Sequence, residues 1–207
     1  MKMNLPNRLT VLRLCLVPVL LLVGMLTVIP FYLSCLICAV LFIGTAVTDM
    51  LDGKIARKNN LITDFGKFMD PIADKFMVIG AMFVILYKFE NLRTLMIITL
   101  MIVVFRELAV TSMRLVVSTG QSIVVAANML GKVKTVSQIV AVSTVFLEPV
   151  VQLAARWIGE AITGECLAWR TDIVPLTWAS ILFCLVMTVW SGMNYILSYW
   201  KYLDPQK

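Results

Sequence analysis

Long apolar stretches, separated by short polar junctions, follow one another along the chain. A transmembrane helix needs about 20 largely apolar residues, and six segments come close to that length. No internal repeat, low-complexity tract or long linker interrupts them. The pattern predicts an all-α, polytopic integral membrane protein, with six transmembrane helices in one domain over residues 1–207. The expected spans are 12–30, 32–53, 66–87, 92–117, 133–155 and 174–200.

Composition agrees with this pattern. Hydrophobic residues make up 60% of the chain and charged residues 14%. A soluble domain carries about 45–50% apolar and about 25% charged residues. A single soluble core of this size could not bury so much apolar surface. We therefore expect the protein to lie in a bilayer.

The distribution of basic residues predicts an orientation. With a cytoplasmic N-terminus, 14 of the 18 Lys and Arg residues fall on the inner side, and the outer side keeps Lys88, Arg93, Arg156 and Arg170. The positive-inside rule then favours cytoplasmic N- and C-termini. The net charge of +6 suits anionic lipids or phosphorylated substrates, and the scattered placement of the basic residues argues against nucleic-acid binding. Aromatic residues of the last span are expected to anchor it at the interface: Trp190, Tyr195, Tyr199 and Trp200.

Four carboxylates at helical spacing, Asp49, Asp52, Asp70 and Asp74, flank the junction between the second and third spans, where residues 49–74 read DMLDGKIARKNNLITDFGKFMDPIAD. An acidic side chain deep in a bilayer costs roughly 2.5–3.5 kcal/mol, so this cluster requires a role. Helical spacing sorts its members onto two faces, since positions i, i+3, i+4, i+7 and i, i+4, i+8 point the same way. The faces carry Asp49, Asp52, Gly53 and Ala56, and then Gly66, Asp70 and Asp74.

A tight turn between the two helices, with Thr63 or Asp64 capping the second, would bring the four acids together. Converging carboxylates repel one another and require a counter-charge, which two divalent cations would supply. Oxygen ligands without Cys or His favour Mg²⁺ or Mn²⁺, and paired metals suit phosphoryl displacement. Arg57 could add a bidentate phosphate contact. The alternatives are an ion-conducting carboxylate chain or helix-end charges that face water.

This segment resembles the signature of the CDP-alcohol phosphotransferase family, DxxDGxxAR, eight residues and GxxxDxxxD, at every fixed position. The resemblance implies six transmembrane helices, usually in a homodimer, with a cytoplasmic active site. It implies metal ligation by Asp49, Asp52, Asp70 and Asp74, with Asp74 also as the general base. CDP-lipid binding would fall to Asp52, Gly53, Ala56, Arg57, Gly66 and Asp70. The acceptor hydroxyl would attack the β-phosphorus of the CDP-lipid, and CMP would leave.

The acceptor must be inferred from other parts of the chain. Buried arginines are usually paired or functional, and four basic residues could hold an anionic phosphate head: Arg106, Arg114, Lys132 and Lys134. The segments LPNRLTVLR, RELAVTSMR and GKVKTVSQ resemble those of bacterial phosphatidylglycerolphosphate synthases. That resemblance implies CDP-diacylglycerol as donor, glycerol 3-phosphate as acceptor and a bacterial inner membrane as location.

Other interpretations remain open. Arg106 with Glu107 could be a structural charge arrangement, and Lys132 and Lys134 could reflect topology alone. The polar positions Asn7, Thr10 and Arg13 fit surface anchoring of a short interfacial helix as well as substrate contact. Another acceptor, such as phosphatidylglycerol in a cardiolipin synthase, inositol phosphate or serine, would keep the enzyme class. A divalent-cation transporter belongs to another class, but such sites usually lie near the midplane, often in inverted repeats.

Overall fold

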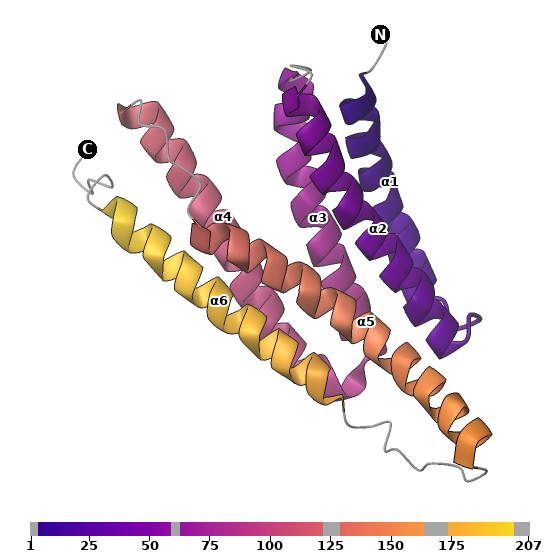
Figure 1. The fold of residues 1–207 in the computed structure, drawn as a ribbon. Helices are drawn as coiled ribbons and strands as arrows, with labels where there is room; N and C mark the ends of the chain where they lie inside the picture. The colour runs from indigo at the N-terminus through magenta and orange to yellow at the C-terminus, as the bar shows by residue number, and fades with distance from the viewer. Residues whose placement is uncertain (1–3, 59–62, 122–128, 164–173, 201–207) are drawn as a thin grey trace.

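Residues 4–58, 63–121, 129–163 and 174–200 are described by a computed structural model, and every regular element within them is helical. The elements are α1 (Leu5–Met25), α2 (Phe31–Lys58), α3 (Asp64–Lys88), the 3-10 helix η1 (Glu90–Leu92), α4 (Arg93–Gln121), α5 (Met129–Thr163) and α6 (Pro175–Tyr199) (Figure 1). The prediction of six long helices is confirmed. The predicted bounds of the first are wrong, because α1 ends at Met25 and a non-helical connection follows.

Five of these helices are long and apolar enough to cross a membrane: α1, α2, α4, α5 and α6. At most 39% of any such span is buried within the protein, so most of its side chains are at least partly exposed. Leu22 and Phe105, for example, are 62% and 70% exposed. A continuous apolar exterior of this kind requires a lipid environment. The chain is therefore a multi-pass membrane protein.

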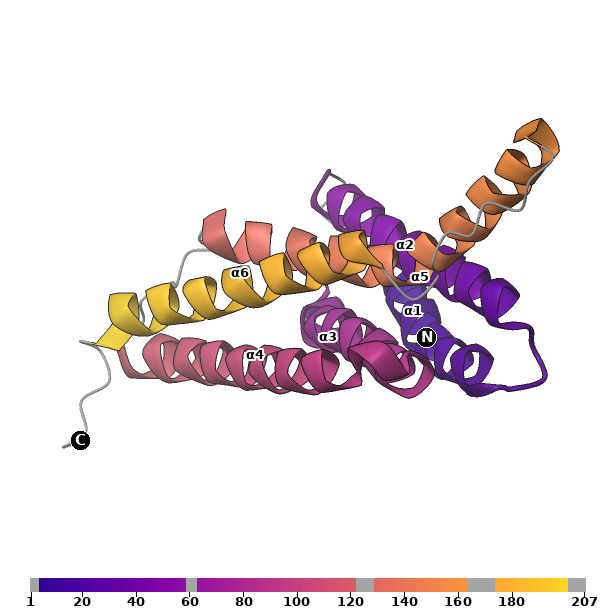
Figure 2. The ribbon, with the colours of Figure 1, turned by 90° about the horizontal axis from the view of Figure 1, so that it is seen from below.

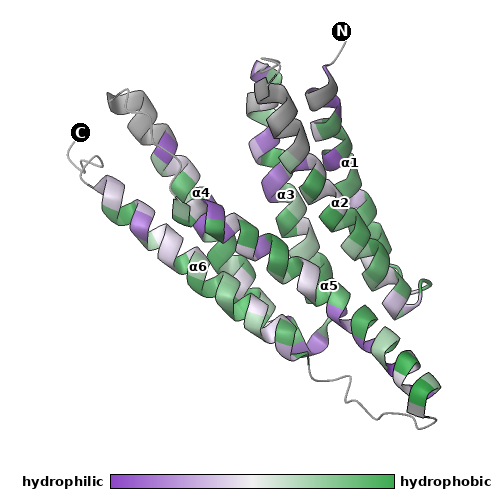
Figure 3. Cartoon of the chain, viewed as in Figure 1, coloured by the Kyte–Doolittle hydropathy of each residue, from purple (hydrophilic) through white to green (hydrophobic). Residues whose placement is uncertain are grey.

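The third helix is the exception, because its first half is charged. Asp64, Lys67, Asp70, Asp74 and Lys75 all lie before Phe76, after which α3 is uncharged up to Tyr87. Figure 3 shows this division, with hydrophilic residues toward one end of α3 and hydrophobic residues toward the other. Thr63 caps the polar end, since its hydroxyl oxygen accepts a hydrogen bond from the Gly66 amide at 3.1 Å. Of the two predicted caps, Thr63 and Asp64, the structure shows Thr63 in this role, and Asp64 is the first residue of α3.

Helices α1 and α3 run in the same direction and touch closely at glycines, which let helix backbones approach one another. A Cβ on Gly80 would lie 2.8 Å from Cγ1 of Val17, and one on Gly24 would overlap Val84. Apolar side chains from α2, α3 and their neighbours, among them Phe42 and Ile85, fill the core between these helices. The polar beginnings of α1 and α3 are thereby held side by side.

Helices α1, α2 and α3 form one group and α4 and α6 another. Helix α5 connects the two groups, because it packs against α2 on one side and α6 on the other. Its last turns extend beyond the bundle (Figure 2). Glu148, which with Pro149 interrupts the fifth predicted span, is buried. Its carboxylate accepts hydrogen bonds from the backbone amides of Leu176, at 3.3 Å, and Thr177, at 2.7 Å. Glu148 therefore accepts hydrogen bonds from two backbone amides in the first turn of α6, which have no partner within the helix.

Candidate active site

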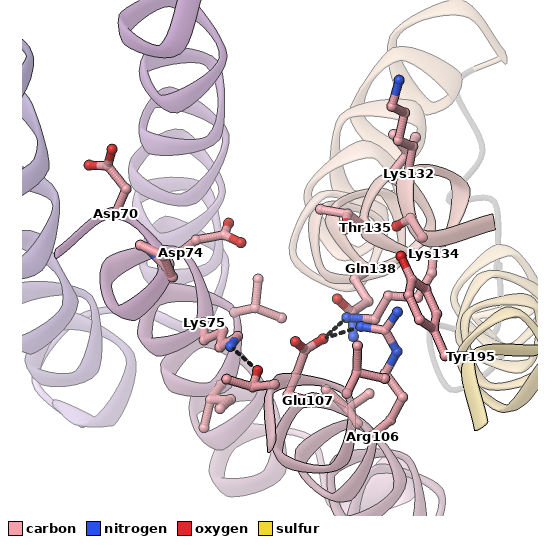
Figure 4. A pocket seen from close by; sticks show the side chains of 18 of the residues that line it. Asp70, Asp74, Lys75, Arg106, Glu107, Lys132, Lys134, Thr135, Gln138 and Tyr195 are labelled. Atoms are coloured by element: carbon pink, nitrogen blue, oxygen red, sulfur yellow. Dashed lines mark hydrogen bonds and ion pairs between the residues drawn. The ribbon is translucent and has the colours of Figure 1, made fainter. Parts of the chain in front are cut away.

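A cavity of about 610 Å³ opens between the two groups of helices, and its opposite sides carry opposite charge. The side formed by α2 and α3, called here the acidic wall, carries Asp49, Asp70 and Asp74. The side formed by α4 and α5, called the basic wall, carries Arg106, Arg114, Lys132 and Lys134. Figure 4 shows the α3 carboxylates on one side and the basic residues with Glu107 on the other. The structure thus brings these predicted residues of both sets to one cavity.

The first helix holds part of the acidic wall in place. The buried guanidinium of Arg13 forms an ion pair with Asp49, and the Thr10 hydroxyl donates a 2.7 Å hydrogen bond to Asp70. Asn7 accepts a 2.9 Å hydrogen bond from the Thr63 hydroxyl. All three α1 residues are buried, at 8% exposure or less. Surface anchoring by Asn7, Thr10 and Arg13 is therefore wrong, because these side chains point into the bundle.

Gly66 belongs to the same contact between α1 and α3. A Cβ at Gly66 would lie 3.2 Å from Oδ1 of Asn7 and 3.7 Å from Oδ2 of Asp70. Its lack of a side chain therefore makes room for α1 beside the acids. A larger residue here would push Asn7 away and disturb the support of Asp70.

Asp74 differs from the other two acids, because it has no hydrogen-bond or ion-pair partner among the described residues. Its side chain is half-buried and points into the cavity toward the basic wall, whereas Asp70 points away toward α1 (Figure 4). Among the described side chains, no three Asp, Glu, Cys or His residues converge as a ready metal-binding group. The candidate ligands on the acidic wall, Asp49, Asp70 and Asp74, all offer carboxylate oxygens, and this chemistry fits Mg²⁺ or Mn²⁺.

The predicted residues Asp52, Gly53, Ala56 and Arg57 have side chains outside the described part of the chain, although their backbone continues α2. The antiparallel register of α2 and α3 shows where this backbone lies. Lys88 donates to Ser34 at 2.9 Å and Thr45 donates to the Met77 sulfur at 3.2 Å. Eleven residues of α2 thus run against eleven of α3. Continued from Thr45, the register sets Asp49 level with Ala73 and Asp52 level with Asp70.

The basic wall is organised around Glu107. Its carboxylate accepts from the Arg106 guanidinium at 3.1 Å and also pairs with the Lys134 ammonium. The three side chains are only 4–14% exposed. One buried acid between two buried cations leaves an excess positive charge that faces the cavity. The Nε of Arg106, also buried, has no hydrogen-bond partner among the described residues.

Tyr195 of α6 lies between two arginines and is almost fully buried, at 3% exposure. The Arg114 guanidinium donates a 2.7 Å hydrogen bond to the Tyr195 hydroxyl. The Arg106 and Arg114 guanidinium carbons also lie 5.7 and 5.2 Å from its ring centroid, within the range of cation–π attraction. The prediction that Tyr195 anchors the helix at the membrane interface is therefore wrong. Its place near the end of an apolar span gave no sign of this contact.

Small residues make room for this aromatic contact. A Cβ on Gly192 would lie 3.2 Å from Cγ of Arg106, and a Cβ on Gly131 would lie 3.6 Å from the Tyr195 hydroxyl. Lys75 donates a 2.7 Å hydrogen bond to Thr111 and so ties α3 to α4 at the cavity. Lys132 lines the cavity as well but remains exposed. The basic wall therefore has a buried inner part, Arg106 and Lys134 with Glu107, and two exposed cations, Arg114 and Lys132.

Comparison with known proteins gives consistent results. The model of the CDP-alcohol phosphatidyltransferase family matches residues 3–190. A CDP-diacylglycerol–glycerol-3-phosphate 3-phosphatidyltransferase of Bacillus subtilis is 38% identical, over 97% of this chain and 97% of its own length. Proteins of the same name are 35% identical in Rickettsia felis, over 80% of this chain and 86% of their own, and 31% identical in Yersinia enterocolitica, over 99% and 100%.

Proposed function

The chain belongs to the CDP-alcohol phosphatidyltransferase family, and on that premise we propose that it transfers the phosphatidyl group of CDP-diacylglycerol to sn-glycerol 3-phosphate. The products are phosphatidylglycerol phosphate and CMP. The observation that carries this proposal is the cavity with its two walls, acidic on α2 and α3 and basic on α4 and α5. One wall suits metal-bound diphosphate and the other a phosphorylated alcohol.

The acidic wall would hold the CDP-lipid through two Mg²⁺ or Mn²⁺ ions. Asp49, Asp52, Asp70 and Asp74 are the proposed ligands, and the register of α2 against α3 supports the inclusion of Asp52 beside Asp70. When bound, the ions neutralise the diphosphate and the charge that develops on the leaving CMP. The nucleotide would contact the same helix junction through Asp52, Gly53, Ala56, Arg57, Gly66 and Asp70.

The basic wall would hold the phosphate of glycerol 3-phosphate. Arg106 and Lys134 carry more positive charge than Glu107 can balance, and the unpaired Nε of Arg106 remains available to a ligand oxygen. Arg114 and Lys132 line the same cavity and add charge. Because arginine offers several donors in a fixed plane, it suits a phosphate group. These contacts support a phosphorylated acceptor over a neutral one.

Asp74 is the proposed general base, because it faces the basic wall and has no other described partner. It would take the proton from the primary hydroxyl of glycerol 3-phosphate as that oxygen attacks the β-phosphorus. A new bond forms between the acceptor oxygen and this phosphorus, and its bond to the oxygen of CMP breaks. The proton stays on Asp74 until product leaves, and CMP departs with the electron pair.

We further propose that the protein lies in a bacterial inner membrane, with both termini and the cavity on the cytoplasmic side. Figure 1 shows the start of α1, the end of α2, the start of α3 and the end of α6 toward one side of the bundle. The uncharged half of α3, from Phe76 to Tyr87, would form the apolar part of the sixth span. The family resemblance further supports one catalytic domain per chain and a homodimer, which chemical cross-linking in membranes would test.

An acceptor panel tests the proposed function. Purified protein with CDP-diacylglycerol and Mg²⁺ or Mn²⁺ should release CMP with glycerol 3-phosphate and not with phosphatidylglycerol, inositol phosphate or serine. Chelation of the metal should stop the reaction, and added metal should restore it. Full activity after chelation would contradict the metal role, and a preference for another acceptor would contradict the substrate.

A pair of variants of α3 tests the base. Asp74→Asn should lose most turnover while CDP-lipid binding partly survives. Asp64→Asn is the matched control, because Asp64 is exposed in the first turn of the same helix and outside the signature. An unchanged rate in Asp74→Asn would refute its role as base.

A further inference from the structure

Gln138 of α5 carries a buried amide that nothing in the proposed mechanism uses. The residue is 3% exposed and lines the cavity, and its Nε2 has no hydrogen-bond partner in the part of the chain that the structure describes. Buried polar groups are nearly always paired, and an unpaired buried donor is unfavourable. An orphaned donor at the edge of a cavity therefore points to a ligand oxygen.

The position of Gln138 says how deep this oxygen would lie. Gln138 follows Lys134 by four residues on α5, a rise of about 6 Å at 1.5 Å per residue. Val78 follows Asp74 by one turn on α3, and Val103 precedes Glu107 by one turn on α4. Because Val78 and Val103 also line the cavity, its floor is largely apolar at this level. Figure 4 shows Gln138 beside the Glu107 and Arg106 cluster.

We propose that the Gln138 amide donates a hydrogen bond to the non-reacting C2 hydroxyl of glycerol 3-phosphate and so selects acceptors that carry it. This inference rests on the proposed function. The cations of the basic wall already supply the charge that a phosphate requires, whereas Gln138 is neutral. A neutral amide suits a hydroxyl oxygen, and the C2 hydroxyl lies close to the phosphate on a short carbon chain. The primary hydroxyl remains free to face Asp74.

The test uses two acceptors and the full-length protein. Glycerol 3-phosphate is compared with 3-hydroxypropyl phosphate, which keeps the phosphate and the reacting hydroxyl but lacks the C2 hydroxyl. We expect the wild-type protein to prefer glycerol 3-phosphate by about tenfold in kcat/KM, the scale of one hydrogen bond. In Gln138→Met the preference should fall to about onefold, through a higher KM for glycerol 3-phosphate. The KM for CDP-diacylglycerol and kcat should stay unchanged.

Gln152→Met is the matched control, because it makes the same replacement on the same helix outside the cavity lining. It should keep the wild-type preference. The ratio of the two kcat/KM values does not depend on how much protein is folded, so the acceptor preference can be measured even for a partly unfolded variant. If Gln138→Met does not fold, Gln138→Asn, whose amide is one carbon shorter, should show the same loss of preference.

Three outcomes in the Gln138 variant, and one in the wild-type protein, would overturn the inference. First, the preference for glycerol 3-phosphate could survive in Gln138→Met. Second, the KM for both acceptors could rise equally, which would assign the amide to the phosphate. Third, the KM for CDP-diacylglycerol could rise instead. An active wild-type protein with no preference between the acceptors would also refute it. Failure of the proposed function is distinguishable, because the wild-type protein would then use neither acceptor.

Discussion

Replacement of Glu107 by glutamine should destabilise the protein markedly. Glu107→Gln keeps the shape of the side chain but removes the negative charge between the Arg106 guanidinium and the Lys134 ammonium. Lys134 is 4% exposed and Arg106 11%, so water can do little to screen the two cations from each other. The perturbation leaves two like charges buried without their counter-ion.

The expected magnitude follows from this burial. Removal of one partner from a buried ion pair costs about 3–5 kcal/mol. A change of 1 kcal/mol shifts the unfolding midpoint by about 2–4 °C in a chain of 150–250 residues. Glu107→Gln should therefore lower the unfolding midpoint by roughly 6–20 °C. Glu160→Gln is the matched control, because Glu160 forms a half-exposed pair with Arg156, and such pairs contribute about 0–1 kcal/mol.

Thermal unfolding in detergent, with and without glycerol 3-phosphate, measures this effect. The dianionic ligand should stabilise Glu107→Gln more than the wild-type protein, because its phosphate replaces part of the missing negative charge. Equal midpoints for Glu107→Gln and Glu160→Gln would refute the structural role of Glu107. Equal stabilisation of wild type and Glu107→Gln by the ligand would refute phosphate binding at this wall.

Two further substitutions test the supports of each wall. Tyr195→Phe keeps the ring between the arginines but loses the hydrogen bond from Arg114, so the KM for glycerol 3-phosphate should rise by about tenfold. Initial rates measure this, with Tyr32→Phe as control, and an unchanged KM would contradict it. Thr10→Val removes the donor to Asp70, and loss of such outer support typically weakens metal binding by about 10–100-fold. The Mg²⁺ concentration for half-maximal rate should rise accordingly, and an unchanged metal requirement would exclude this role for Thr10.

Local features of the fold could be predicted from the sequence. Apolar length indicated six helices, and α6 begins and ends within one residue of its predicted span. The spacing from Asp49 to Asp74 placed carboxylates on two successive helices. The cap of the second was narrowed to Thr63 or Asp64, because that role depends only on neighbouring residues, and Thr63 fills it. These features follow from helical period and local hydrogen bonding.

Features that depend on the packing of distant segments could not be predicted. Thr10 contacts Asp70 across 60 residues, and Arg114 contacts Tyr195 across 81. An aromatic residue near the end of an apolar span is typical of an interfacial anchor, and only the crossing of α6 beside α4 shows that Tyr195 is buried. One local feature of the sequence did indicate the α1 contacts. Polar residues recur every three positions in an otherwise apolar helix, at Asn7, Thr10 and Arg13.

Anomalous diffraction from Mn²⁺ in crystals grown with CDP-diacylglycerol tests the central claim most directly. The account predicts two Mn²⁺ peaks between α2 and α3, within bonding distance of the carboxylates of Asp49, Asp52, Asp70 and Asp74, with the diphosphate against them. Peaks elsewhere, or a diphosphate bound between α2 and α3 without metal, would contradict it.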